Sequence, residues 1–220
     1  MVSDNQTVKK EEKLERILET AGSLFATGDF QNVLMDEIAT AAKVGKGTLY
    51  NYFKSKEDLF FSIIRSRLER LLSLLENTYD TRNDTLKNLR SFVIHLHKFM
   101  SKHPHFYLIL KREENSFDRT GNEVIQQLQE RMYLLMGSIV EQGVREGVFR
   151  KKMENQLVTW LILGMVDGLR KSKKTIYEKE EAIDVLLDLL IRGISEAGIE
   201  MKTKYAEYRH KRQQQNIGET

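Results

Sequence analysis

The segment from Asp36 to Lys56, DEIATAAKVGKGTLYNYFKSK, constrains the fold more than any other part of the chain. Apolar residues in its first part follow the i, i+3, i+4 spacing of one helical face: Ile38, Ala41 and Ala42. The pattern breaks at Val44 and Gly45, and Leu49 and Phe53 resume it four residues apart. The segment therefore predicts two short helices around a tight turn, which is a helix-turn-helix.

The second of these helices has polar residues on the faces away from Leu49 and Phe53. Thr48 and Asn51 can donate to and accept from the edges of DNA bases. Glycine costs roughly 1 kcal/mol relative to alanine inside a helix, so Gly47 makes sense where a backbone approaches another molecule closely. We expect DNA contacts from Lys46, Gly47, Thr48, Tyr50, Asn51, Tyr52 and Lys56. A packed helical hairpin with solvated lysines is the alternative.

The local charge of this segment supports DNA as the partner. From Lys43 to Lys56 there are four lysines and no acidic residue. Contacts to the phosphate backbone supply much of the affinity of a protein for DNA, and lysines provide them.

The run AAKVGKGTLYNYFKSKEDL resembles the signature of TetR-family transcriptional regulators. That signature reads Gly-Val-Ser-Lys-Gly-Thr-Leu-Tyr-x-Tyr/His-Phe and is followed by Lys-Glu-x-Leu. The likeness covers about Lys13 to Ile63, and beyond it only length and helical organisation agree. The resemblance implies an all-α homodimer with an N-terminal three-helix DNA-binding domain and a C-terminal helical domain that binds an effector and forms the dimer.

Three positions depart from the family pattern. Lys43 occupies the turn position where the family has glycine, and we expect it to adopt a left-handed conformation at some cost. Gly45 replaces the serine that caps the second helix, a modest loss because glycine is an acceptable N-cap. Val33 and Leu34 replace the hydroxyl residue that starts the preceding helix, so we do not expect its phosphate contact here.

Composition narrows the class of protein. The 220 residues allow one or two domains, and the net charge of +3 does not by itself indicate nucleic acid. Without cysteine there is no disulfide framework, thiol nucleophile or cysteine metal site. The polar N-terminus does not resemble a secretion signal, and the apolar run from Leu157 to Val166 is shorter than the ~20 residues that span a bilayer. We therefore expect a cytoplasmic protein without a membrane segment.

Helical periodicity and a single proline predict an all-α chain of about nine helices. The polar first ten residues are expected to form a frayed arm before a helix at Glu11–Thr27. Ser55 and Asp58 have the spacing of a capping box for the fourth helix, which should run to about Tyr79. Later helices are expected at about Asp84–Lys102, His105–Asn115, Asn122–Glu146, Asn155–Ser172 and Glu178–Gly198. The predicted domains are 10–56 for DNA binding and 57–200 for effector binding and dimerisation, followed by a polar basic tail at 201–220.

The segment TWLILGMVDGL is apolar nearly all round, so its helix should bury one side in its own domain and the other against a partner. The last helix has a similar composition. Two such helices from each of two chains would make the four-helix dimer of the family, and a larger monomeric core is the alternative. The expected interface residues are Leu163, Val166, Leu186 and Leu190.

An effector site is implied mainly by the resemblance, which suggests a cavity in the C-terminal domain. The expected ligand contacts are Tyr107, Arg112, Met132, Met136, Trp160 and Asp167. Plain core packing is the alternative for the methionines and aromatics, and a structural partner is the alternative for Asp167. The histidines between His95 and His105 lack convergent metal-ligand spacing, so we expect no metal or other cofactor.

The sequence thus predicts a DNA-binding transcriptional regulator, most simply a repressor that a small, mainly apolar ligand releases from its operator. The alternative is an all-helical module that binds ligands or proteins and whose helix-turn-helix is only structural. An all-α enzyme would need a catalytic arrangement, and the sequence offers no serine–histidine–acid set, phosphate loop or carboxylate pair.

Overall fold

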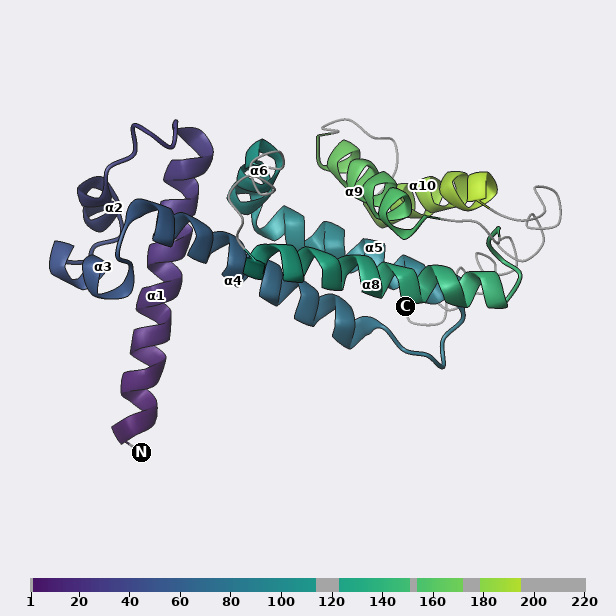
Figure 1. Cartoon of the computed structure of the whole chain (residues 1–220), viewed down its shortest axis with the longest axis horizontal. Helices are drawn as coiled ribbons and strands as arrows, with labels where there is room; N and C mark the ends of the chain where they lie inside the picture. Colours follow the sequence, from purple (N-terminus) through teal and green to yellow (C-terminus); the bar gives the residue numbers. More distant parts are fainter. Residues whose placement is uncertain (1, 114–122, 151–153, 172–178, 195–220) are drawn as a thin grey trace, which may run out of the picture. The chain divides into compact units, whose positions relative to one another are not determined.

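The computed structural model describes residues 2–113, 123–150, 154–171 and 179–194, and within them the chain forms nine helices (Figure 1). These are α1 (Val2–Thr27), α2 (Met35–Ala41), α3 (Lys46–Tyr52), α4 (Lys56–Thr78), α5 (Thr85–Lys102), α6 (Pro104–Glu113), α8 (Glu123–Arg145), α9 (Asn155–Lys171) and α10 (Lys179–Ile194). The predicted all-α class is confirmed. The predicted basic tail at 201–220 lies outside the described residues.

The chain divides into two compact units, and each is described by itself. Unit 1 comprises Met1–Ser73 and Phe99–Glu130, and unit 2 comprises Leu74–Lys98 and Arg131–Thr220. Unit 1 contains the helix-turn-helix, and α6 packs against α1 within it. The domain boundary predicted near residue 56 stays a prediction, since α4 contributes residues to both units.

The N-terminal residues differ from the expectation. Helix α1 begins at Val2, so residues 2–10 form helical turns that extend away from α2 and α3 rather than a frayed arm (Figure 1). The physical reason is that the sequence contains neither proline nor glycine before Gly22, so nothing stops the helix from continuing toward the N-terminus.

The core of unit 1 forms under the helix-turn-helix. Ile17, Ala21 and Phe25 are spaced four residues apart along α1 and are completely buried. Ile38 of α2 and Leu49 of α3 are also completely buried. Burying each large aliphatic or aromatic side chain stabilises a fold by roughly 1.5–3 kcal/mol. The short helices α2 and α3 are therefore held to α1 by apolar packing, and their outer faces are left for other contacts.

The capping residues predicted for α4 are confirmed. The backbone N–H of Asp58 donates to Ser55 Oγ at 3.1 Å, and the Asp58 carboxylate accepts from the backbone N–H of Lys54 at 2.9 Å. Two N–H groups at the start of α4 are therefore satisfied by side chains.

An ionic cluster joins α1 to α4 inside unit 1. Arg67 is almost completely buried, and its Nη2 lies 2.5 Å from Glu15 Oε1 and 2.7 Å from Glu19 Oε1. Glu15 also pairs with Arg70 at 3.0 Å, and His103 Nδ1 lies 3.3 Å from Glu19 Oε1. Burial raises the pKa of the Glu15 carboxyl, but the bonds and charges of the two arginines outweigh it, so the net pKa is lowered.

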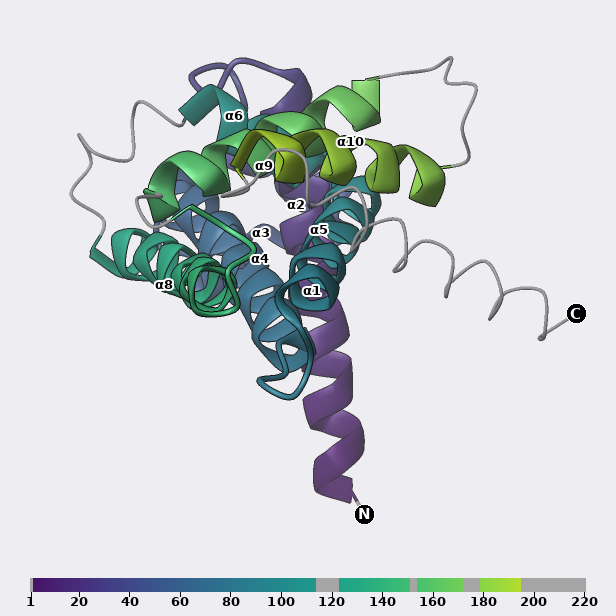
Figure 2. The ribbon, with the colours of Figure 1, turned by 90° about the vertical axis from the view of Figure 1, so that its right-hand side faces the viewer.

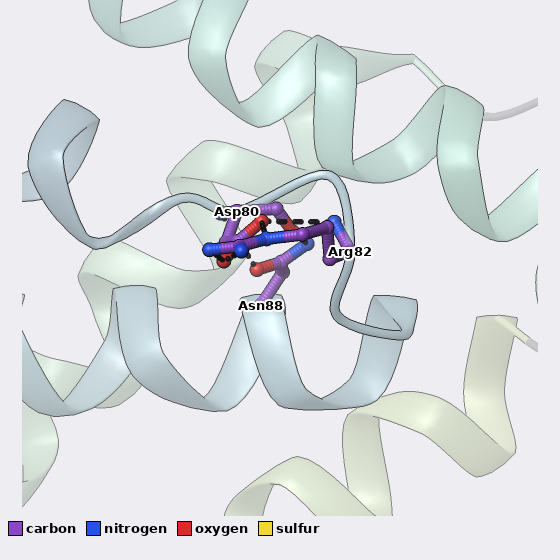
Figure 3. Close-up of polar contacts among 3 residues, drawn as sticks. All are labelled: Asp80, Arg82 and Asn88. Carbon is purple, nitrogen blue, oxygen red and sulfur yellow. Dashed lines mark hydrogen bonds and ion pairs between the residues drawn. The ribbon is translucent and has the colours of Figure 1, made fainter.

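In unit 2, polar side chains fix the loop between α4 and α5 (Figure 3). Arg82 donates to both carboxylate oxygens of Asp80 at 2.7–3.1 Å, and these bonds lower the pKa of Asp80 to about 2. Asn88 donates to the Asp80 carbonyl at 2.9 Å and to Gln142 Oε1 at 3.0 Å. Gln142 in turn donates to the Asn83 carbonyl at 2.6 Å. The loop is thereby tied to both α5 and α8.

Helix α8 ends in a turn that needs its glycines. Gly147 has φ +69°, and the N–H groups of Gly147 and Val148 donate to the carbonyls of Val144 and Gly143 at 3.2 and 2.8 Å. This bonding is a Schellman motif. A Cβ on Gly143 would lie 2.2 Å from Phe149 Cδ2, so the ring occupies the space that a side chain would need.

Candidate DNA-reading surface

The turn between α2 and α3 has the conformation expected from the sequence. Lys43 has φ 53°, and its N–H donates to the Thr40 carbonyl at 3.1 Å. The next N–H, from Val44, donates to the Ala39 carbonyl at 2.9 Å. These two bonds form a second Schellman motif, and they hold a lysine where glycine would be free of strain. The turn fixes the direction in which α3 begins.

Helix α3 begins without a side-chain cap. Gly45 is its N-cap, as predicted, with extended backbone angles and no capping side-chain bond. A Cβ built on Gly47 would meet no atom within 4 Å, so the fold itself does not require glycine there. Leu34, the N-cap of α2, likewise provides no capping bond and is 63% exposed.

Most of the residues predicted to contact DNA lie on the exposed face of α3. Leu49 is completely buried, and Phe53 just after the helix is nearly so. The exposed candidates are Lys46, Gly47, Tyr50 and Asn51. Thr48 and Tyr52 are half-buried at the edges of this face. We call Lys46, Gly47, Thr48, Tyr50 and Asn51 the reading face; their contacts with DNA stay a prediction.

Lys46 makes one contact inside the protein. Its Nζ lies 2.9 Å from Asp36 Oδ2, and the two side chains are 63% and 60% exposed. The hydrogen bond and then the charge of Asp36 raise the pKa of Lys46. An ion pair this exposed contributes little to stability, so Lys46 can exchange Asp36 for a phosphate at small cost.

Lys56 does not belong to the exposed face. Its Nζ donates to the backbone carbonyls of Phe30, Gln31 and Val33 at 2.8, 3.0 and 3.1 Å. Because an ammonium group has three N–H donors, these bonds leave none for a phosphate. The geometry therefore opposes the phosphate contact that the sequence suggested for Lys56.

The candidate ligand residues fall in different environments. Tyr107 is half-buried in unit 1, while Met132 and Met136 of unit 2 are buried, as their apolar character requires. Asp167 of unit 2 is half-buried. Trp160 is 51% exposed, and its Nε1 donates to Tyr133 Oη at 3.2 Å, so it lies on an outer surface. Arg112 is part of α6, but its side chain lies outside the described part of the chain.

The apolar helices α9 and α10 lie side by side in unit 2 (Figures 1 and 2). Val166 is only 1% exposed, so it faces the core of its own chain rather than an outer surface. Leu163, Leu186 and Leu190 are half-buried. The large apolar residues that are most exposed on these helices were not among the predicted interface residues: Leu157, Trp160 and Leu161 of α9 and Leu189 of α10, at 46–61%. The three in α9 follow the i, i+3, i+4 spacing of one face, but this helix is apolar on nearly all sides, so the spacing alone did not single out that face.

None of the helices in the described residues is long and apolar enough to cross a membrane. In the same ranges, no group of three or more histidine, aspartate or glutamate side chains could hold a metal ion.

Helices α2 and α3 form a helix-turn-helix whose apolar side is buried and whose second helix has an exposed polar face. This arrangement is typical of the class of helix-turn-helix DNA-binding proteins. Residues 17–63 match the family described as bacterial regulatory proteins, tetR family, and residues 83–194 match the tetracyclin repressor-like C-terminal domain. The chain therefore belongs to the TetR family of DNA-binding transcriptional regulators.

Similar proteins carry regulator names. The uncharacterised HTH-type transcriptional regulator YhgD of Bacillus subtilis is 24% identical over 182 residues, which cover 81% of this chain and 95% of that protein. The fatty acid metabolism regulator protein of the same organism is 24% identical over 192 residues, covering 84% and 97%.

Solved structures have the same fold. The ketosteroid regulator KstR2 of Mycobacterium tuberculosis superimposes with a TM-score of 0.69 at 20% identity, over 84% of this chain and 95% of that one. FadR from Bacillus subtilis, solved in complex with stearoyl-CoA, gives a TM-score of 0.64 at 20% identity, over 82% and 98%.

Proposed function

We propose that the protein is a homodimeric repressor that occupies a pseudo-palindromic operator until a mainly apolar small molecule binds its C-terminal domain. The observation that carries the DNA-binding part is the reading face of α3. Buried Leu49 and Phe53 fix this helix to its unit, while Lys46, Gly47 and Asn51 are exposed for base edges and phosphates.

The dimer is supported by the outer faces of α9 and α10. Leu157, Trp160, Leu161 and Leu189 leave large apolar surface in water, which a second copy of the same face would cover. Two copies related by a two-fold axis would present two α3 helices to successive major grooves, which lie about 34 Å apart. The proposed interface is centred on these four exposed residues, whereas the sequence predicted Leu163, Val166, Leu186 and Leu190. Of those, Val166 is buried and the other three are half-buried.

The ligand class is supported by composition and by the relatives. Methionine and aliphatic side chains dominate the buried surface of α8 and α9, which suits a largely hydrophobic molecule. One similar protein is named for fatty acid metabolism, and one similar structure contains stearoyl-CoA. A long-chain acyl-CoA is therefore the first effector to test. A coupling of about 1–3 kcal/mol would weaken operator binding by several-fold to about a hundredfold.

Selection of bound genomic fragments, followed by footprinting, tests the DNA-binding part. We expect an inverted-repeat footprint and an affinity that falls steeply with salt as counterions are released. Equal binding to all fragments, without salt dependence, would favour a helical module that binds ligands or proteins and whose helix-turn-helix is only structural.

The effector part needs a separate titration. Stearoyl-CoA should release the selected duplex, whereas coenzyme A alone should not. By reciprocity the duplex must weaken stearoyl-CoA binding by the same factor. Equal affinities for stearoyl-CoA with and without the duplex would exclude it as an allosteric effector and leave DNA binding intact.

A further inference from the structure

The ammonium group of Lys56 is enclosed by the turn between α1 and α2. It donates to the carbonyl oxygens of Phe30, Gln31 and Val33 at 2.8, 3.0 and 3.1 Å. These bonds link the first residue of α4 to a segment 23–26 positions earlier in the chain. All three N–H donors of the ammonium are used within unit 1.

The backbone N–H groups of this turn donate to Asp29 and not to the carbonyls that Lys56 contacts. Its backbone N–H groups at Asn32 and Val33 both donate to the Asp29 carbonyl, at 3.0 and 3.3 Å. The N–H of Gln31 donates to the Asp29 side chain at 3.2 Å. Lys56 supplies donors for the carbonyls of Phe30, Gln31 and Val33. Phe30 is half-buried and Val33 is buried, so their carbonyls are the ones for which an internal donor matters most, whereas Gln31 is exposed.

An aromatic contact strengthens the same link. Lys56 Nζ lies 4.7 Å from the centroid of the Phe30 ring, within the range of a cation–π interaction. Phe60, four residues further along α4, meets the same ring edge to face with centroids 5.1 Å apart. Residues at i and i+4 lie on one side of a helix, so α4 holds Phe30 with a cation and a ring from one face.

The turn leads directly to the DNA-binding helices. It ends at Leu34, the N-cap of α2, whose carbonyl accepts from the N–H of Ile38 at 3.1 Å. Helix α2 continues through the Lys43 turn into α3. The place where α2 starts therefore determines where α3 presents its reading face.

We propose that Lys56 is a positioning residue, which ties the start of α4 to the start of α2 and makes no contact with phosphate. It acts on DNA binding through the backbone of Val33 and Leu34, which sets where α2 starts. The proposal rests on DNA binding by α3, but the cage itself exists in the free protein and can be tested without DNA.

The wild-type protein provides the first test. Lysine ammonium groups give NMR signals only when their protons exchange slowly, and a caged ammonium should meet that condition. We expect one such signal in the free protein, assigned by its loss in Lys56→Met, and unchanged when the selected duplex is added. A signal that is absent from the free protein and appears only with DNA would overturn the proposal.

Three variants provide the second test, by titrating the selected duplex at several salt concentrations. Lys56→Met should lower the midpoint of thermal unfolding by several degrees and weaken the selected duplex about tenfold, while the salt slope stays unchanged. Lys56→Arg should resemble Lys56→Met, because a planar guanidinium cannot direct three bonds as an ammonium does. Lys54→Met is the matched control: it removes an exposed charge two residues away and should leave the unfolding midpoint unchanged.

If Lys56 instead contacted a DNA phosphate, the Lys56 variants would give the opposite results. Lys56→Met would then reduce the salt slope by about 1 without loss of stability, and Lys56→Arg would restore it. If the wild-type protein binds no duplex at all, the regulator proposal fails, while the ammonium signal of the free protein still decides whether the cage exists.

Discussion

The exposed faces of α3 and α9 both contain glycines that the fold does not require. A Cβ built on Gly47 of α3, or on Gly164 or Gly168 of α9, meets no atom within 4 Å. Gly143 of α8 differs, because a Cβ there would overlap the ring of Phe149. Since glycine destabilises a helix by roughly 0.5–1 kcal/mol relative to alanine, the open positions favour surfaces that another molecule approaches closely.

The side chains around these glycines differ between the two helices. Gly47 lies among Lys46 and Asn51, which suit a charged, hydrogen-bonding partner such as DNA. Gly164 follows Trp160 and Leu161, which are about half exposed and suit an apolar partner such as a second copy of the chain. We therefore expect DNA to approach α3 at Gly47, and a second copy of the chain to approach α9 at Gly164.

The largest effect is expected from a charge on the apolar face of α9. Leu161→Glu should abolish the dimer and weaken operator binding at least a hundredfold, because a desolvated carboxylate would enter the interface. Leu108→Glu in α6 is the matched control, since the two leucines are 46% and 45% exposed. Sedimentation at micromolar concentration measures the outcome. A wild-type protein that is already monomeric would contradict the interface.

The next largest effects are expected on the free energy of unfolding, when two glycines of unit 2 are replaced by alanine. Gly143→Ala should lower the free energy of unfolding by about 1–3 kcal/mol, because its methyl group overpacks against Phe149. Gly164→Ala should raise it by roughly 0.5–1 kcal/mol. Both are measured by urea unfolding in the Leu161→Glu background, where dimerisation does not contribute. Equal signs for the two substitutions would refute the distinction between a packed and an open glycine.

Gly47→Ala in α3 should make the folded protein more stable but weaken its binding to the operator. We expect the free energy of unfolding to rise by about 0.5–1 kcal/mol, while the operator dissociation constant rises about tenfold because a methyl group enters the space of the DNA. Urea unfolding and duplex titration measure the two quantities. An unchanged operator affinity would show that DNA does not approach this part of the helix.

The smallest effect concerns pH and the ionic cluster below the helix-turn-helix. Burial, and then the charge of Arg67, lower the pKa of His103, while Glu19 opposes them and Lys102 adds to them. As the pH falls, the imidazole of His103 therefore takes up a proton in the unfolded chain before it does so in the folded protein. The contribution of His103 to stability is lost as the pH falls below its ordinary pKa of 6.5. Urea unfolding of His103→Gln should show less loss across this window than wild type. An identical pH dependence in the two proteins would exclude His103 as the source.

The carboxyl group of Glu15 affects stability in a different pH range and therefore provides a control for the His103 measurement. Its pKa is lowered, so its contribution is present above its ordinary pKa of 4.5 and is lost only at more acidic pH. A loss of stability that begins below pH 5 would thus belong to carboxyl groups such as Glu15 rather than to His103.

Local rules predicted much of this structure from the sequence. Helical periodicity placed both ends of α5, the end of α8 and the start of α9 to within one residue. The predicted ends at Asn122 and Ser172 lie outside the described residues. The Lys43 turn and the Gly45 cap followed from positions in a known pattern, because each depends on only a few neighbouring residues. The reading face followed from the 100° spacing of residues around a helix.

Longer-range contacts could not be predicted in this way. The role of Lys56 depends on carbonyls more than twenty residues earlier, and no spacing rule identifies which of them lack donors. Helix α9 is apolar on nearly all sides, so periodicity could not tell that Val166 faces inward and Leu161 outward. The 51% exposure of Trp160 likewise depends on tertiary packing, which local spacing does not show.

The most direct test of DNA reading by α3 is a comparison of wild type and Asn51→Ala on the selected operator and on a scrambled duplex. Asn51 is exposed on α3, and an amide that pairs with a base edge contributes about 1–3 kcal/mol of discrimination. Wild type should therefore prefer the operator strongly, and Asn51→Ala should lose several-fold to a hundredfold of that preference while binding the scrambled duplex as before. A ratio of the two affinities that is the same for both proteins would contradict the assignment of α3 as the recognition helix.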